Sequence, residues 1–295
     1  MNIGIDIGGS HIAIGLVQND KIIIKKEHNW TEQEKNNFWE SVEIYSKKLI
    51  KEIIKQASKD NIEKIGIGFP SGNIENGKVT KFGKTIDLPK ILSEYFNVPT
   101  FLKNDVKCSA LCEKKYGSLK KYNNCFFMTL GTGIGGAYFY NGELVKPKKF
   151  QGFEIGHMII NKDGKECNCG NKGCFEQYAS MRIFRNKIEK LFNIKNVNSY
   201  KVFEILSSKE KEEEVKNIIE DYINYLETGI TNLINIFEPD AISIGGSFTY
   251  YAPIFMDKLK ERIQSKFKNR TIPDIIIASF ENDAGIIGAS MLEEN

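Results

Sequence analysis

The chain has 295 residues, enough for two lobes that each bury their own hydrophobic core. Its 41 basic and 38 acidic side chains leave a net charge of only +3, which argues against nucleic acid or an anionic membrane surface as the main partner. The sequence contains neither a signal peptide nor an apolar run of the roughly 20 residues that span a membrane, so we expect a cytoplasmic protein with reduced thiols.

The first part of the chain alternates between strands and helices. Apolar residues at every second position, bounded by turn residues, predict strands over 2–8, 11–17, 21–27, 64–69 and 98–103. Apolar residues that recur every three or four positions predict helices over 32–58 and 89–96, and another helix begins at Asp105. These elements make a first α/β lobe, residues 1–117.

The second part of the chain repeats this plan. Strands are expected over 125–130, 135–140, 241–244 and 275–279, and helices over 176–192, 212–237, 253–267 and from Asp283. Each part opens with adjacent strands and continues as β-α-β units, which predicts an α/β fold of two lobes. The second lobe spans residues 118–282.

Two glycine turns occupy corresponding places between the first two strands of each lobe, Gly8-Gly9-Ser10 and Gly131-Thr132-Gly133. Glycine lets backbone N–H groups approach an anion closely. Asp6, at the strand end beside the first turn, could hold Mg²⁺, because hard cations prefer carboxylate oxygens. The first turn alone would fit an ordinary hairpin equally well, and the matching second turn is what favours a phosphate site.

Two better-known phosphate motifs match only formally. Gly131-x-Gly133-x-x-Gly136 fits the dinucleotide fingerprint, but a strand follows it where that fingerprint needs a helix, which argues against a nicotinamide enzyme. The segment from Gly72 to Lys78 resembles a P-loop, but Val79 replaces the required Ser or Thr. Its Asn76-Gly77 pair instead predicts a hairpin turn.

Asn104-Asp105 lies where the strand over 98–103 meets the next helix. A carboxylate in this place would face a ligand crevice at the strand ends, although Asn or Asp here also fits a plain helix cap. A third glycine turn, Gly245-Gly246, follows the strand over 241–244 and precedes a helix. That placement suits the phosphates or the adenosine of a nucleotide.

The densest cluster of metal-ligand residues lies between residues 154 and 178. One histidine and three cysteines, His157, Cys167, Cys169 and Cys174, are the ligand set of a closed tetrahedral zinc site. A catalytic zinc would keep a position open for water, so we expect a structural one. Three unpaired buried thiols are the alternative. Glu154 and Glu176 flank the cluster and are free to face a substrate, and Cys108, Cys112 and Cys125 are expected to be small core residues.

Taken together, these motifs resemble the ROK family of bacterial sugar kinases, open-reading-frame proteins and repressors. The resemblance rests on the order and spacing of Asp6–Ser10, Asn104-Asp105, Gly131–Gly136, Glu154–His157 and the Cys167–Glu176 segment, and it extends over nearly the whole chain. It implies an actin-like, ribonuclease-H-like ATPase fold of two lobes with nucleotide and sugar in the cleft. It also implies that the last helix, 283–295, packs back on the first lobe.

The resemblance assigns roles to individual residues. Asp105 would be the general base that deprotonates the attacking sugar hydroxyl, and Asn104, Glu154, His157 and Glu176 would bind sugar hydroxyls. His157 would also be a zinc ligand through its other nitrogen. ATP and Mg²⁺ would lie against the glycine turns: Asp6, Gly8, Gly9, Ser10, Gly131, Thr132 and Gly133 near the phosphates, Gly245 and Gly246 near the adenosine. A homodimer is expected by analogy with the family.

We therefore expect an ATP-dependent hexose kinase, with glucose favoured because Glu154, His157 and Glu176 form the usual hexose set. N-acetylmannosamine, fructose and allose stay open as acceptors, because Lys81-Phe82-Gly83 departs from the Asn-Leu and Trp found there in many family glucokinases. A repressor of the family would need an N-terminal winged helix-turn-helix, whereas the phosphate turn here begins near residue 6. A sugar-sensing protein without turnover is the third class, and the presence of Asp6, Asp105 and Glu154 argues against it.

Overall fold

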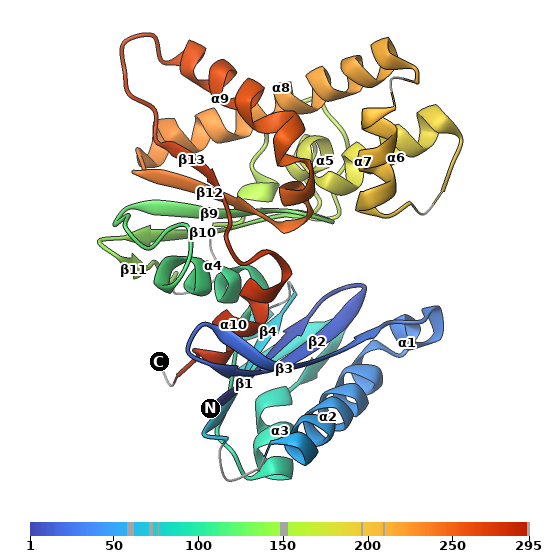
Figure 1. The fold of residues 1–295 in the computed structure, drawn as a ribbon, viewed down its shortest axis with the longest axis vertical. Helices are drawn as coiled ribbons and strands as arrows, with labels where there is room; N and C mark the ends of the chain where they lie inside the picture. The colour runs from blue at the N-terminus through green and yellow to red at the C-terminus, as the bar shows by residue number, and fades with distance from the viewer. Residues whose placement is uncertain are drawn as a thin grey trace. The chain divides into compact units, whose positions relative to one another are not determined.

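The computed structural model describes residues 1–57, 62–70, 73–75, 77–147, 153–195, 197–208 and 210–293, apart from the side chains of residues 73 and 75. The chain forms two compact units (Figure 1). The first comprises Met1–Lys120, Lys146–Gly152 and Ser279–Asn295, and the second comprises Lys121–Val145 and Phe153–Ala278. Each unit is built around its own five-stranded sheet.

The first unit has a sheet in the order β3-β2-β1-β4-β8. Its strands are β1 (Asn2–Ile7), β2 (His11–Gln18), β3 (Lys21–Asn29), β4 (Lys64–Phe69) and β8 (Thr100–Asn104). The strands β1 to β3 are antiparallel, whereas β1, β4 and β8 run parallel, so the carboxyl ends of these three strands meet at one edge of the sheet.

Helices cover both faces of this sheet. Its first face packs against α2 (Phe38–Gln56), which follows the short helix α1 (Glu32–Asn36), and against α3 (Leu88–Phe96). Its second face packs against α4 (Asp105–Lys115) and α10 (Ala284–Ser290). A small antiparallel sheet of β5 (Asn73–Glu75), β6 (Lys78–Lys81) and β7 (Lys84–Ile86) completes the unit.

The sequence of β1 explains why its two faces differ. Ile3, Ile5 and Ile7 point to one face and are fully buried against α2, whereas Gly4 and Asp6 point to the other. Gly4 pairs with Gly66 of β4, and a Cβ atom on Gly66 would lie only 1.7 Å from the Ala289 carbonyl oxygen of α10. These glycines therefore let the backbone of α10 lie directly on the sheet, and the same alternation turns Asp6 toward α10.

Glu113 fixes the point where the chain returns to the first unit. Its buried carboxylate accepts hydrogen bonds from the backbone N–H groups of Ser279 and Phe280 at 2.7 and 2.8 Å, and from the backbone and side chain of Ser118 at 2.8 and 2.7 Å. A buried carboxylate is tolerated when donors surround it in this way. The arrangement ties α4 to the segment that leads into η4 (Glu281–Asp283) and α10.

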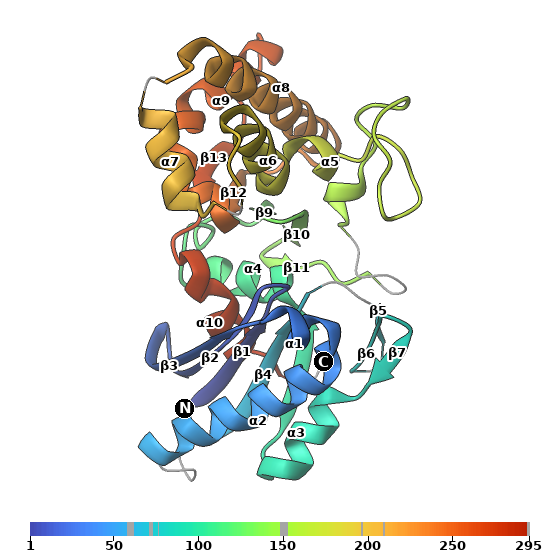
Figure 2. The ribbon, with the colours of Figure 1, turned by 90° about the vertical axis from the view of Figure 1, so that its right-hand side faces the viewer.

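The second unit has a sheet in the order β11-β10-β9-β12-β13. Its strands are β9 (Cys125–Leu130), β10 (Ile134–Tyr140), β11 (Glu143–Leu144), β12 (Ala241–Gly245) and β13 (Asp274–Ile277). Helices α5 to α9 gather on one side of the sheet (Figures 1 and 2). They are α5 (Glu176–Ala179), α6 (Met181–Phe192), α7 (Ser199–Ser207), α8 (Glu212–Phe237) and α9 (Ala252–Lys266), with 3-10 turns η2 (Ile155–His157) and η3 (Gly246–Tyr251).

Three expectations about helices are corrected by the structure. The helix over 32–58 is two helices, because the backbone of Asn37 leaves the helical conformation between α1 and α2. The helix over 176–192 is likewise broken at Ser180, whose extended backbone separates α5 from α6. The helix expected over 283–295 is shorter, because α10 starts at Ala284 and ends at Ser290. Helix α7 was not predicted. Neither break has a Pro or Gly at the junction, so composition gives no signal for it.

The predicted strands are present with small shifts at their ends, and the predicted hairpin after β5 is confirmed by its antiparallel pairing with β6 and by Gly77 at φ +76°. Residues Ser71, Gly72 and Asn76 lie outside the described part of the chain. Cys108, Cys112 and Cys125 are buried, as expected.

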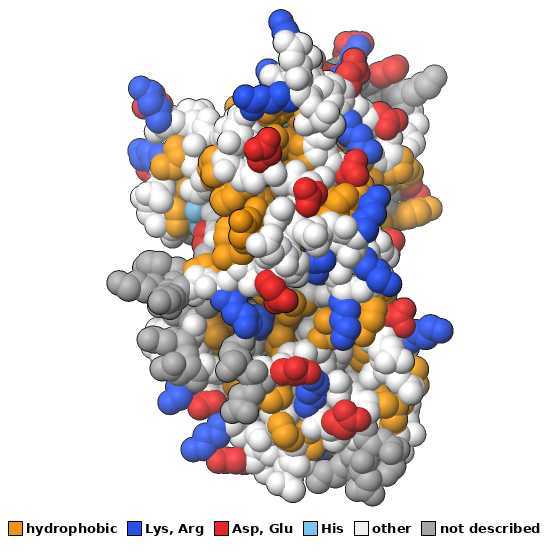
Figure 3. Space-filling model, turned by 90° about the vertical axis from the view of Figure 1, so that its left-hand side faces the viewer, with side chains coloured by type: hydrophobic (Ala, Val, Ile, Leu, Met, Phe, Trp, Pro, Cys, Tyr) orange, Lys and Arg blue, Asp and Glu red, His pale blue; other side chains and the backbone are white. Residues whose placement is uncertain are grey.

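Acidic and basic side chains are interspersed on the face drawn in Figure 3, in keeping with the nearly balanced charge. Among the helices of the described ranges, none is both long and apolar enough to cross a membrane.

The close contact between α10 and the glycines of the first sheet can be tested by substitution. Gly66→Ala should lower the free energy of unfolding by about 1–3 kcal/mol, because its Cβ has to displace the backbone of α10. Denaturant unfolding of the purified variant measures this. Gly9→Ala is the matched control, since a Cβ there meets no atom within 4 Å and should change stability by less than about 0.5 kcal/mol. Equal stability of the two variants would contradict the proposed packing.

Candidate functional site

The first glycine turn joins β1 to β2. The Gly8 N–H donates to the His11 carbonyl oxygen at 2.8 Å, and the Ser10 hydroxyl lies 3.1 Å from Nδ1 of His11. Burial lowers the pKa of His11, which favours the neutral ring. The side of the turn at Gly9 is open, since a Cβ atom there would meet no atom within 4 Å. The turn can therefore receive a ligand against its backbone.

Asp6 lies at the end of β1, beside this turn and against Gly285 at the start of α10. Burial, followed by the negative charge of Asp105, raises the pKa of Asp6 to about 7, while Lys25 acts in the opposite direction. Two carboxyl groups thus share one edge of the first sheet, because Asp6 ends β1 and Asp105 follows the parallel strand β8. A bound cation would relieve their repulsion.

Asn104 and Asp105 form the junction of β8 and α4. The Asn104 side chain accepts a hydrogen bond from the Lys107 N–H at 3.2 Å, which confirms the helix-cap interpretation. Its Nδ2 also donates to Oδ1 of Asp105 at 3.0 Å, and the same oxygen accepts from the Val106 N–H at 2.8 Å. One carboxylate oxygen of Asp105 is therefore fixed, and Asn104 both caps the helix and orients the acid.

Lys81 lies near this junction, although the sequence pointed to it only as a departure from the family pattern. Its Nζ donates to the Pro70 carbonyl oxygen at 3.2 Å and lies over the rings of Phe38, Phe69 and Phe82. Burial lowers the pKa of Lys81, and the charge of Asp105 opposes that shift. A positive charge thus lies within electrostatic reach of Asp105.

The structure gathers the predicted zinc ligands in the second unit. The ligand atoms of His157, Cys167, Cys169 and Cys174 all lie within 4.8 Å of one another. Cys169 Sγ is 3.5 Å from Cys174 Sγ, and Cys167 Sγ is 3.6 Å from Nδ1 of His157. Bonds of about 2.3 Å to sulfur in a tetrahedral site put ligand atoms roughly 3.5–4 Å apart, so the cluster fits a zinc ion.

Backbone hydrogen bonds shape the loop that carries these cysteines. The Cys167 N–H donates to the carbonyl oxygen of Asn171 at 2.8 Å, and the Gly173 N–H donates to the carbonyl oxygen of Lys165 at 2.7 Å. Gly173 has φ +77° and lies against the backbone of Asn161, so only glycine fits there. Hydrogen bonds from Asn171 lower the pKa of the exposed Cys169 thiol, which favours the thiolate that binds a metal.

Glu176 connects the cysteine cluster with the second glycine turn. Its Oε1 lies 3.7 Å from Cys167 Sγ, and its Oε2 would lie 2.9 Å from a Cβ atom on Gly133. Glu154 is exposed and precedes η2, where its carbonyl oxygen accepts from the His157 N–H at 2.9 Å. The structure therefore brings His157, Glu176 and the second glycine turn together around the cluster.

The second and third glycine turns are neighbours. The parallel pairing of β9 with β12 puts Gly245 opposite Thr129, and Gly246, at φ +76°, lies against the backbone of Leu130. Gly246 leads into the 3-10 turn η3, and the expected helix α9 follows that turn. Both turns thus lie at the carboxyl edge of the second sheet.

Arg182 contacts the second turn, although no motif in the sequence indicates this contact. Its backbone N–H donates to the Gly131 carbonyl oxygen at 3.1 Å, and its side-chain Nε donates to the Thr132 carbonyl oxygen at 3.0 Å. The Gly131 N–H also bonds to the Gly133 carbonyl oxygen at 3.0 Å. Arg182 is separated from the turn by 50 residues, so only the folded chain shows the contact.

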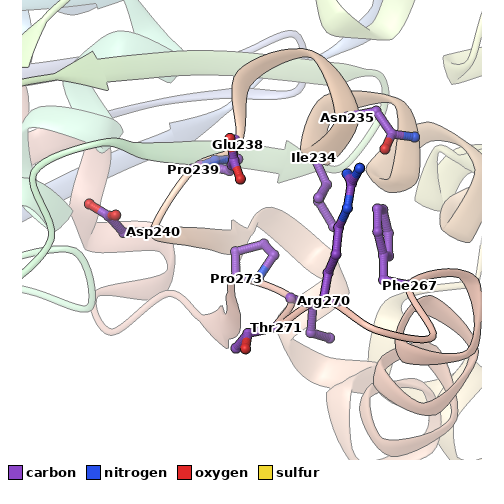
Figure 4. A pocket seen from close by; sticks show the side chains of 10 residues that line it. Ile234, Asn235, Glu238, Pro239, Asp240, Phe267, Arg270, Thr271 and Pro273 are labelled. Carbon is purple, nitrogen blue, oxygen red and sulfur yellow. The ribbon is translucent and has the colours of Figure 1, made fainter.

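None of the predicted site residues lines a cavity of about 470 Å³ in the second unit (Figure 4). It lies where α8 ends and β12 begins, with Asp240, Phe267 and Arg270 among its lining residues. Asp240 precedes β12, whereas Gly245 ends that strand, so the cavity is at the opposite end of β12 from the glycine turns.

The chain was compared with known proteins and solved structures. It is 28% identical over 271 residues to the xylose repressor of Bacillus spizizenii, with 90% of this chain and 69% of the repressor covered. It is 26% identical over 312 residues to the glucokinase of Thermotoga maritima, with 98% and 96% covered. A ROK family glucokinase from Streptomyces griseus in complex with glucose and AMPPNP has a TM-score of 0.78 at 22% identity, with 98% and 97% covered.

The structural likeness confirms the expected α/β architecture, the two-lobed actin-like, ribonuclease-H-like fold. The family model for the ROK family matches residues 2–295. Because that match includes the glycine turns, the Asn104-Asp105 pair and the cysteine cluster, the chain belongs to the ROK family.

Proposed function

We propose that this chain is an ATP-dependent hexose kinase that transfers the γ-phosphate to a sugar hydroxyl, with glucose as the favoured acceptor. The observation that carries the proposal is the edge of the first sheet, where an open glycine turn, Asp6 and Asp105 lie together. These are the three parts that phosphoryl transfer requires, namely an anion-binding turn, a carboxylate for Mg²⁺ and a base. The glucokinase of T. maritima, similar over nearly its whole length, supports the reaction class.

Asp105 acts as the general base in this proposal. It takes the proton from the attacking hydroxyl while the oxygen bonds to the γ-phosphorus and the bond to the β-phosphate oxygen breaks, releasing ADP. Asn104 suits a supporting role, because one N–H of its amide orients Asp105 and the other is left for a sugar hydroxyl. Asp6 would hold Mg²⁺, which neutralises charge on the phosphates when it is bound.

Glu154, His157 and Glu176 bind sugar hydroxyls in this proposal. His157 has Nδ1 turned toward Cys167, which leaves Nε2 for a hydroxyl. Zinc held by His157, Cys167, Cys169 and Cys174 would fix the shape of this segment. The nucleotide phosphates would lie against Gly8, Gly9, Ser10, Gly131, Thr132 and Gly133, and the adenosine near Gly245 and Gly246.

A sugar-sensing protein without turnover is the second candidate, because the xylose repressor of B. spizizenii is also a relative. Measurable turnover separates the two, since a sensor would bind sugar without forming ADP. N-acetylmannosamine, fructose and allose are alternative acceptors for the kinase. The homodimer and the cytoplasmic location stay predictions.

Asp105→Asn tests the proposed base. The amide keeps the size and an acceptor oxygen but cannot take a proton, so turnover should fall by about 10²–10⁴ while sugar affinity changes little. Coupled ADP release and sugar titration calorimetry measure the two quantities. Asp87→Asn is the control, because Asp87 is also an acid at the start of a helix, where it caps α3, and its variant should keep full turnover. Near-normal turnover of the Asp105 variant would exclude this residue as the base.

The metal site gives another prediction. Purified protein should contain one zinc ion per chain, and Cys169→Ser should lose it, because serine cannot supply the thiolate. Elemental analysis and thermal unfolding check both, and we expect a lower melting temperature. Cys125→Ala removes a cysteine that lies outside the cluster and should retain the ion. Zinc-free wild-type protein with unchanged folding would rule out the structural site.

A further inference from the structure

Trp30 contacts the first glycine turn through two hydrogen bonds. Its indole Nε1–H donates to the Gly8 carbonyl oxygen at 3.0 Å, and its backbone N–H donates to the Ser10 carbonyl oxygen at 2.9 Å. The backbone bond continues the pairing of β2 with β3, which any residue would make. The indole bond depends on the side chain, because among the apolar residues only tryptophan carries such a donor.

The indole is itself held in place. Trp30 is 6% exposed, and its ring makes edge contacts with His28, Phe38 and Tyr45 at centroid distances of 5.7, 6.4 and 5.8 Å. The next residue, Thr31, begins α1 with a capping box to Glu34. Both sides of Trp30 are therefore fixed, so the indole N–H has one direction in which to donate.

Because the peptide bond is planar, the hydrogen bond from Trp30 to the Gly8 carbonyl also orients the Gly9 N–H. In a trans peptide the carbonyl and the following N–H point in opposite directions. When Trp30 holds the Gly8 carbonyl, the Gly9 N–H must point away from Trp30. Without a side chain at Gly9, the turn on its own would leave this peptide plane free to rotate. Gly9 is exposed, and a Cβ atom there would meet no atom within 4 Å, so there is room for a ligand beside this peptide.

We propose that Trp30 is a positioning residue that holds the Gly8–Gly9 peptide in the orientation that binds a nucleotide phosphate. This inference rests on the proposed kinase function, because it assumes that the turn receives Mg·ATP. It adds a residue outside the glycine motif, whose role is to reduce the reorganisation that phosphate binding would otherwise require. Its loss should weaken nucleotide binding more than sugar binding.

Trp30→Phe tests the proposal, since phenylalanine keeps the aromatic packing and removes the donor. The KM for Mg·ATP should rise about three- to ten-fold, as expected for one lost hydrogen bond, while the KM for the sugar stays within about twofold. Trp39→Phe is the matched control. Trp39 also donates from Nε1 to a backbone carbonyl, that of Lys81 at 3.1 Å, and its loss should leave the KM for Mg·ATP within about twofold.

A fluorescence measurement covers the case in which Trp30→Phe does not fold. The chain has two tryptophans, so in the Trp39→Phe protein Trp30 is the sole tryptophan. The emission of Trp30 should change as Mg·ADP is added and should reach a plateau when the site is saturated. If Mg·ADP is shown to bind and the emission does not change, the proposal is overturned. An unchanged KM for Mg·ATP in folded Trp30→Phe would also overturn it. Wild-type protein that binds no Mg·nucleotide would instead refute the kinase function itself.

Discussion

The backbone of α10 lies directly on the central strands of the first sheet, and this contact exists only because residues 4 and 66 have no side chain. The alternation of isoleucine and glycine in β1 creates it, with Ile3 and Ile5 facing α2 and Gly4 facing α10. Asp6 continues that alternation, which is why its carboxylate lies against Gly285 beside the first glycine turn. The same strand pattern thus sets the packing of the unit and the position of its acidic group.

The two units share one feature, in that glycine turns follow the carboxyl ends of their strands. In the first unit these ends carry the Gly8 turn and Asp105, and in the second they carry the turns at Gly131 and Gly245. The second unit adds the cysteine cluster, which contacts Glu176 and through it approaches Gly133. A structural metal in that place would stabilise the shape of the proposed sugar-binding segment without taking part in phosphoryl transfer.

Sequence reasoning succeeded where the signal is local. The alternation in β1 predicted a strand, and four ligand residues within a short span predicted the cluster at His157. It failed where the signal is tertiary. The indole of Trp30 meets Gly8 across 22 residues and Arg182 meets Thr132 across 50, and no spacing in the chain indicates either contact. The helix breaks at Asn37 and Ser180 were missed because neither residue is a Pro or Gly.

Release of ADP from Mg·ATP tests the central claim most directly, with glucose, N-acetylmannosamine, fructose, mannose, allose and N-acetylglucosamine offered in turn as acceptors. The account predicts strong turnover with one sugar of this panel, glucose first among them, and a background rate without sugar. Background rates with all six sugars, from folded protein with its zinc bound, would contradict the kinase and favour a protein that senses sugar.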